Sequence, residues 1–131
     1  MKRDINLVKE ILCFLESSDE IITEILLEHY SPFKNHDDKA VTYHICLLHE
    51  AGYISGGVFI SGDDGSNMDF ATLQLTWEGH EFLEILKDKE VLNQIISLNE
   101  KGLKSMSFDV IKDIAKKLIE TKAKKLLGLG N

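Results

Sequence analysis

The sequence predicts a small α+β fold in which helices precede and follow a β-hairpin. Apolar residues recur at helical spacing near both ends of the chain, and two strand-like runs flank a stretch rich in Gly and Asp at 61–67. The first of these runs directly follows a helical pattern that closes at Gly52. A chain of 131 residues is long enough to bury one compact core.

The first helical pattern begins after Asp4, which is a suitable N-cap. Its expected buried stripe consists of Ile5, Val8, Leu12 and Leu15. The next segment, residues 20–30, fits both a helical and a strand pattern, and we favour the helix.

A second helix begins with Asp37 or Asp38 as its cap and ends at Gly52. Its expected buried stripe consists of Val41, Ile45 and Leu48. Two strands then form a hairpin around the 61–67 tip. Apolar and polar residues alternate in the second strand, so we expect both Leu73 and Leu75 on its buried face.

Thr76 is a suitable cap for the helix after the hairpin, whose apolar bulk comes from Trp77, Phe82, Leu83, Ile85 and Leu86. A further turn or helix ends at Gly102, and a basic amphipathic helix begins at Ser107. This order predicts a winged helix-turn-helix with a two- or three-stranded antiparallel wing and an extra C-terminal amphipathic helix. We therefore divide the chain into a winged-helix domain, 1–100, and a basic C-terminal helix, 101–131.

Two stretches support this prediction by resemblance. Residues 43–54, Tyr-His-Ile-Cys-Leu-Leu-His-Glu-Ala-Gly-Tyr-Ile, look like the passage from helix to wing in winged-helix regulators, and residues 75–83, Leu-Thr-Trp-Glu-Gly-His-Glu-Phe-Leu, look like the passage after the wing. Together with the Met-Lys-Arg-Asp opening, they make most of the chain resemble an uncharacterised family of short bacterial and prophage proteins, a domain of unknown function. The resemblance implies a winged-helix fold and a mobile-element origin, but no activity and no site residues.

The net charge of −7 is unevenly distributed. Residues 1–100 contain 7 Lys or Arg and 19 Asp or Glu, whereas residues 101–131 contain 8 Lys and 3 acidic residues. A basic end of this kind can contact nucleic acid, a membrane surface or the protein's own acidic body, and we favour the last. No run approaches the roughly 20 apolar residues of a membrane span, and no signal peptide is evident, so we expect a cytoplasmic protein with Cys13 and Cys46 as free thiols.

The helix before the hairpin is the recognition helix of this fold, which makes DNA a candidate partner. Its outward residues are expected to be Lys39, Thr42, Tyr43, Cys46 and His49. Only Lys39 is firmly cationic, while acids at the start of the helix and at the wing tip would face the phosphates: Asp37, Asp38, Asp63, Asp64 and Asp69. This face therefore favours a partner other than DNA.

The C-terminal helix has two faces of different character. Its basic face could contact a nucleic-acid backbone or an anionic surface, although a solvated face is the simpler interpretation; its lysines are Lys112, Lys116, Lys117, Lys122, Lys124 and Lys125. Its apolar stripe must be buried, either on its own domain or against a second copy; it consists of Phe108, Ile111, Ala115 and Leu118. A homodimer is expected by analogy with winged-helix proteins that pair through terminal helices.

The sequence offers little catalytic chemistry. His44 and His49 are about 140° apart on a helix and cannot share a metal ion, so we expect His44 to pack or hydrogen-bond near the core. Cys46 and His49 are neighbours on the helix, but no oxyanion site or nucleophile elbow accompanies them. We expect no enzyme activity, no metal, no cofactor and no small-molecule substrate.

The function expected from the sequence is therefore a non-enzymatic interaction module, associated with phage or prophage, that binds a protein partner or itself. The alternative is a DNA-binding transcriptional regulator that uses the helix at 37–51, the wing and the basic C-terminal helix. We expect no membrane partner.

Overall fold

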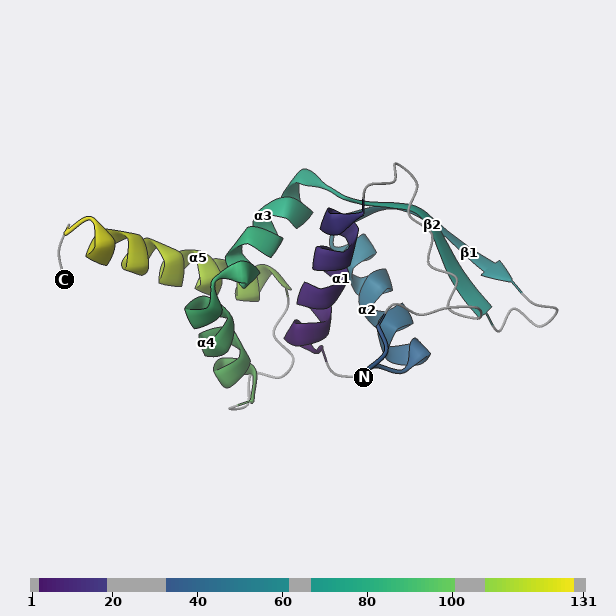
Figure 1. Ribbon diagram of the computed structural model, residues 1–131, viewed down its shortest axis with the longest axis horizontal. Coiled ribbons are helices and arrows are strands. Elements are labelled where there is room, and N and C mark those ends of the chain that lie inside the picture. The colour runs from purple at the N-terminus through teal and green to yellow at the C-terminus, as the bar shows by residue number, and fades with distance from the viewer. Residues whose placement is uncertain (1–2, 19–32, 62–66, 101–107, 129–131) are drawn as a thin grey trace. The chain divides into compact units, whose positions relative to one another are not determined.

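The computed structural model of the protein describes residues 3–18, 33–61, 67–100 and 108–128. Within these ranges it contains five helices and a two-stranded antiparallel sheet, which confirms the predicted α+β class (Figure 1). The chain divides into two compact units inside helix α3, the first ending at Glu81 and the second beginning at Phe82. The predicted helix at 20–30 and most of the hairpin tip lie outside the described residues.

In the first unit, helices α1 (Ile5–Ser17) and α2 (Asp38–Glu50) pack side by side (Figure 1). Asp4 caps α1, because its Oδ1 accepts from the N–H groups of Asn6 and Leu7 at 3.0 and 3.2 Å. Asp37 caps α2, accepting from the N–H of Ala40 at 2.7 Å. Both predicted apolar stripes are buried: Ile5, Val8, Leu12 and Leu15 in α1, and Val41, Ile45 and Leu48 in α2.

The hairpin consists of β1 (Ile54–Ser61) and β2 (Asn67–Leu75), paired from Ile54↔Leu75 to Ser61↔Asn67. The expectation for its buried face is half right, because Leu73 is buried whereas Leu75 is only half-buried. Leu75 lies opposite the buried Ile54 in the first pair of the hairpin, so it shares the predicted face but is covered only in part. Earlier in β2 there is a β-bulge: the pairing shifts between Ser55 and Gly57, and Thr72 adopts a φ of +56°. The bulge changes the phase of the strand.

Gly56 is required at this bulge for two reasons. Its φ is +138°, and a Cβ atom there would lie 2.8 Å from the carbonyl oxygen of Thr72. Phe70, three residues before Leu73 and across the bulge, is therefore buried together with it. The strict alternation expected from the sequence is interrupted at Thr72.

The second unit contains the rest of α3 (Trp77–Lys87), together with α4 (Lys89–Glu100) and α5 (Phe108–Leu126). Helices α4 and α5 are in contact, and Ile95, Ile111 and Ala115 are buried. Helix α5 ends where Gly128, with a φ of +68°, donates its N–H to the carbonyl of Lys125 at 3.2 Å. Among the described helices, none has the length and apolar character needed to cross a bilayer.

Candidate functional site

The outward face of α2 carries one firmly cationic group among the residues predicted to contact a partner. Lys39 is exposed, whereas the other predicted contact residues are half-buried: Thr42, Tyr43, Cys46 and His49. Asp37 and Asp38 are also exposed at the start of this helix. The face of α2 thus combines carboxylates with partly covered side chains, which is a poor match for a phosphate backbone.

His49 serves the hairpin. Its Nε2 lies 3.0 Å from the carbonyl oxygen of Gly56, at the bulge of β1. The imidazole N–H therefore satisfies a backbone acceptor that the irregular strand pairing exposes. This contact ties the end of α2 to the hairpin.

Two further side chains of α2 have pKa values that their surroundings shift. His44 is 1% exposed; its Nδ1 lies 2.7 Å from the carbonyl of Ala40, and its Nε2 accepts the N–H of Asp4 at 2.8 Å. The prediction that His44 packs near the core is confirmed, and burial lowers its pKa below the usual range. Burial, together with the charge of Glu50, raises the pKa of Cys46, so its thiol is protonated at neutral pH.

The start of α3 is fixed against the turn that precedes β1. The N–H of Thr76 donates to the carbonyl of Tyr53 at 3.1 Å, and the hydroxyl of Thr76 donates to the carbonyl of Gly52. The same hydroxyl accepts the N–H of Gly79 at 3.1 Å, so Thr76 caps α3 as predicted. A Cβ atom on Gly79 would overlap the Tyr53 carbonyl oxygen, which shows how closely the helix approaches the turn.

This anchored helix start presents Trp77 to solvent. The residue is 76% exposed, whereas the sequence analysis places it with the apolar side chains of this helix. Helical geometry contains the signal that was missed: Trp77 lies about 140° around the helix from Phe82 and about 180° from Leu86, both of which are buried. Trp77 therefore belongs to the opposite face, and a large exposed aromatic side chain on a rigid support is a typical binding feature.

The lysines of α5 do not form one continuous basic stripe. Lys116, Lys117 and Lys124 are exposed, but on the same outward face lie Asp113 and Glu120, which are also exposed. Asp113 is four residues from Lys117, and Glu120 is four residues from both Lys116 and Lys124, the spacing at which opposite charges on a helix are neighbours. The outward face is therefore of mixed charge, as in an ordinary solvated helix. Lys112 is half-buried on the flank.

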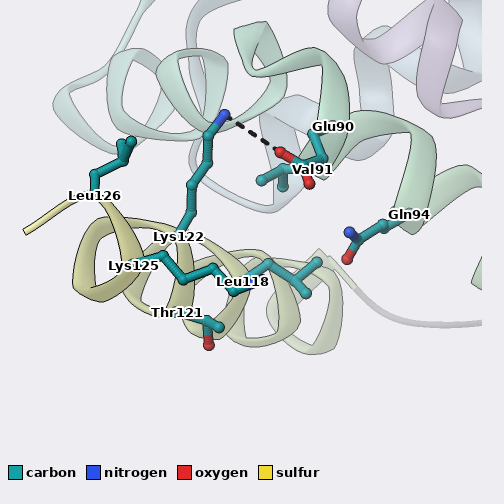
Figure 2. Close-up of a pocket in the computed structure, with 8 residues that line it drawn as sticks. All are labelled: Glu90, Val91, Gln94, Leu118, Thr121, Lys122, Lys125 and Leu126. Atoms are coloured by element: carbon teal, nitrogen blue, oxygen red, sulfur yellow. Dashed lines mark ion pairs between the residues drawn. The ribbon is translucent and has the colours of Figure 1, made fainter. Parts of the chain in front are cut away.

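The remaining lysines, Lys122 and Lys125, border a groove between α4 and α5 (Figure 2). The groove has a volume of about 290 Å³ and is lined by Glu90, Val91, Gln94, Leu118, Thr121, Lys122, Lys125 and Leu126. Figure 2 shows Lys122 reaching from α5 toward Glu90, while Leu126 extends from the same side of the helix. The groove thus combines an apolar lining with two cations and one carboxylate.

Lys122 is held by carboxylates at the start of α4. Its Nζ lies 2.8 Å from Oδ2 of Asp88 and 3.6 Å from Oε2 of Glu90. The other oxygen of Asp88 accepts the N–H groups of Glu90 and Val91 at 3.1 and 3.2 Å, so Asp88 caps α4 while it binds α5. The hydrogen bond from Lys122 lowers the pKa of Asp88 and, reciprocally, raises the pKa of Lys122.

The predicted self-association stripe is distributed over several environments. Ile111 and Ala115 are buried within the single chain, and Leu118 is half-buried at the groove. The side chain of Phe108 lies outside the described residues. Apolar exposure on α5 is instead greatest at its end, where Leu126 and Leu127 are 78% and 71% exposed.

Among the residues that the structure describes, no group of three or more His, Cys, Asp or Glu side chains could hold a metal ion.

These features define a small α+β protein in which a short hairpin positions an exposed tryptophan and a helix pair forms an amphipathic groove. The chain belongs to the family of hypothetical proteins designated DUF2513, whose model matches residues 2–107. It is 32% identical over 119 residues to an uncharacterized protein of Haemophilus influenzae, covering 91% of this chain and 96% of that relative. No solved structure matches the chain. The predicted resemblance to a family of unknown function is thereby confirmed.

Proposed function

We propose that this protein is a non-enzymatic winged-helix module, associated with phage or prophage, that binds a protein partner or a second copy of itself. Support for the winged helix comes from the first unit alone. Helix α1 packs on α2, the turn at Gly52 leads directly into the hairpin, and Thr76 joins the hairpin to α3. In that arrangement α2 occupies the position of a recognition helix and the hairpin that of the wing.

The observation that carries the proposal is the exposure of Trp77. Burying a side chain of this size against a partner removes a large apolar area from water, and tryptophan is enriched among the residues that dominate protein interfaces. The contacts of Thr76 and Gly79 fix the backbone on either side of it. Little ordering is therefore needed when a partner binds.

DNA binding is the second candidate, because Lys39, Lys116, Lys117 and Lys124 are all exposed. The neighbouring charges weaken this candidate function: Asp37 and Asp38 directly precede Lys39, and Asp113 and Glu120 lie among the lysines of α5. Phosphate binding depends on cations that release counterions, and a carboxylate beside each cation opposes that release. A protein partner tolerates such a mixed surface.

The test uses Trp77 as its own probe, since it is the only tryptophan in the chain. The tagged full-length protein is used to capture partners from bacterial cells after nuclease treatment, and each captured protein is purified and titrated against it. We expect the tryptophan emission to shift to shorter wavelength on binding, and Trp77→Ala to lose capture. The matched control is His80→Ala, which removes an exposed side chain one turn further along α3.

The competing function is tested on the same protein with duplex DNA at about 50 and about 200 mM salt. We expect no retardation at either concentration. A complex that forms with a steep salt dependence, without change in the tryptophan emission, would establish the regulator in place of the interaction module.

A further inference from the structure

The groove between α4 and α5 carries an inference about which partner it binds. Part of its lining is apolar: Val91 is buried and Leu118 is half-buried. Leu126 lines the same groove and is 78% exposed. An exposed leucine therefore stands next to an unfilled recess of about 290 Å³. The recess and the side chain that would suit it belong to the same short surface.

The position of Leu126 is well defined by the helix end. The N–H of Leu127 still donates to the carbonyl of Ala123 at 3.0 Å, and the N–H of Gly128 closes the helix on Lys125. Leu126 thus lies within the last regular turn of α5, and its direction is set by the helix. A partner would meet a preformed side chain.

The groove also carries charges of both signs on the same surface. Lys122 is bound at 2.8 Å to Asp88, so Glu90, at 3.6 Å and with a side chain 66% exposed, is the weaker partner of that lysine. Lys125 borders the groove and makes no ion pair with any other described residue. One face therefore presents a cation that has no ion-pair partner among the described residues, a mostly exposed carboxylate, an apolar recess and an exposed leucine.

We propose that a second copy of this chain docks on this groove in a two-fold arrangement, each copy placing Leu126 in the other's recess and Lys125 beside the other's Glu90. In a two-fold dimer the same patch is used on both sides, so each feature must find its complement within that patch. The groove meets this requirement: it carries the opposite charges of Lys125 and Glu90, and the exposed Leu126 lies beside the recess. The inference rests on the proposed function and names the partner at one surface, separate in sequence from Trp77.

The experiment is sedimentation equilibrium of the full chain over a range of micromolar concentrations. We expect the wild type to dimerise and Leu126→Glu to raise the dimer Kd by at least about 30-fold, as for the loss of an interface hot spot. The matched control is Leu127→Glu, because Leu127 is 71% exposed next in sequence but does not line the groove; its Kd should stay within about 3-fold of the wild type.

A charge swap tests the register of the two copies. Lys125→Glu should weaken the dimer about 10-fold, because two carboxylates would then face each other across the interface. Adding Glu90→Lys should restore most of that loss, since the opposite pair is rebuilt in reverse. Circular dichroism of each variant verifies that the helices are retained, and a variant with altered helicity is replaced by the corresponding Gln substitution at the same position.

Three results would overturn the inference. These are a wild type that stays monomeric throughout, equal effects of the Leu126 and Leu127 substitutions, and a monomer whose groove binds a medium-chain fatty acid in a manner abolished by Leu126→Glu. The last would assign the groove to an apolar anion. The proposed function fails separately: a monomeric protein that still captures a partner through Trp77 refutes the dimer and leaves the interaction module intact.

Discussion

Gly79→Ala gives a direct test of how the hairpin and α3 are joined. An added Cβ atom would overlap the carbonyl oxygen of Tyr53 and lie 3.0 Å from its carbonyl carbon. Both atoms belong to the backbone, so no side-chain rotation relieves the overlap. The start of α3 must move by about 1 Å to restore an ordinary contact, and this movement stretches the bond from Thr76 N–H to Tyr53, now 3.1 Å.

The size of the effect follows from three contributions. Forced overpacking costs about 1–3 kcal/mol, and loss of the Thr76 hydrogen bond costs about 1 kcal/mol. Replacing Gly by Ala within a helix returns about 1 kcal/mol. The net expectation is a loss of about 1–3 kcal/mol in the free energy of unfolding, or about 4–12 °C in Tm for a chain of 131 residues.

The assay is urea unfolding followed by circular dichroism, with thermal unfolding as a second measurement. The matched control is Gly57→Ala in β1, where a Cβ atom would meet only the Ala71 carbonyl oxygen at an ordinary 3.7 Å. We expect Gly57→Ala to change stability by less than about 0.5 kcal/mol. An unchanged Gly79→Ala protein, or an equal loss in both variants, would show that the close approach of α3 to Tyr53 is wrong.

Two further predictions concern titratable groups. Because burial lowers the pKa of His44, the unfolded chain binds a proton below about pH 6.5 that the folded chain refuses, so stability present at neutral pH is lost as the pH falls, by up to about 1.4 kcal/mol per pH unit. His44→Gln, measured by urea unfolding at several pH values, should be less stable than the wild type at pH 7 and should lose this slope; an unchanged slope contradicts the assignment. Asp88 has a lowered pKa, so its stabilising contribution is present above its unfolded pKa of 3.8 and disappears as the pH falls through its lower folded value. Asp88→Asn, which keeps a cap for α4 but removes the charge facing Lys122, should protect the first amides of α4 from hydrogen exchange better than Asp88→Ala; equal protection would mean that the cap is unimportant.

Local chemistry explains why much of the fold could be predicted from the sequence. The caps at Asp4, Asp37 and Thr76 were identified correctly, because each is a hydrogen bond between a side chain and an amide two or three residues away. The stripes of α1 and α2 follow from helical periodicity, which fixes the buried face whatever it packs against. The position of His44 near the core was likewise predictable from helical periodicity.

The candidate sites needed more than periodicity. Trp77 was grouped with buried residues, although its helical angle relative to Phe82 would have separated it. The sequence does not show which lysines of α5 face solvent and which face α4. Asp88 binds Lys122 from 34 residues away, and no local sequence pattern reveals this role. Patterns of neighbouring residues cannot reveal an ion pair between residues that are distant in sequence.

The sequence by itself determined the order of the helices and of the hairpin, the helix caps, the buried stripes and the resemblance to its family, because these depend on neighbours along the chain. Tertiary structure alone decided the bulge that allows both Phe70 and Leu73 to be buried, the hydrogen bond between His49 and the Gly56 carbonyl, and the recess between α4 and α5. Each of these arises where segments distant in sequence compete for the same space or the same hydrogen bond. That competition is settled by packing in three dimensions.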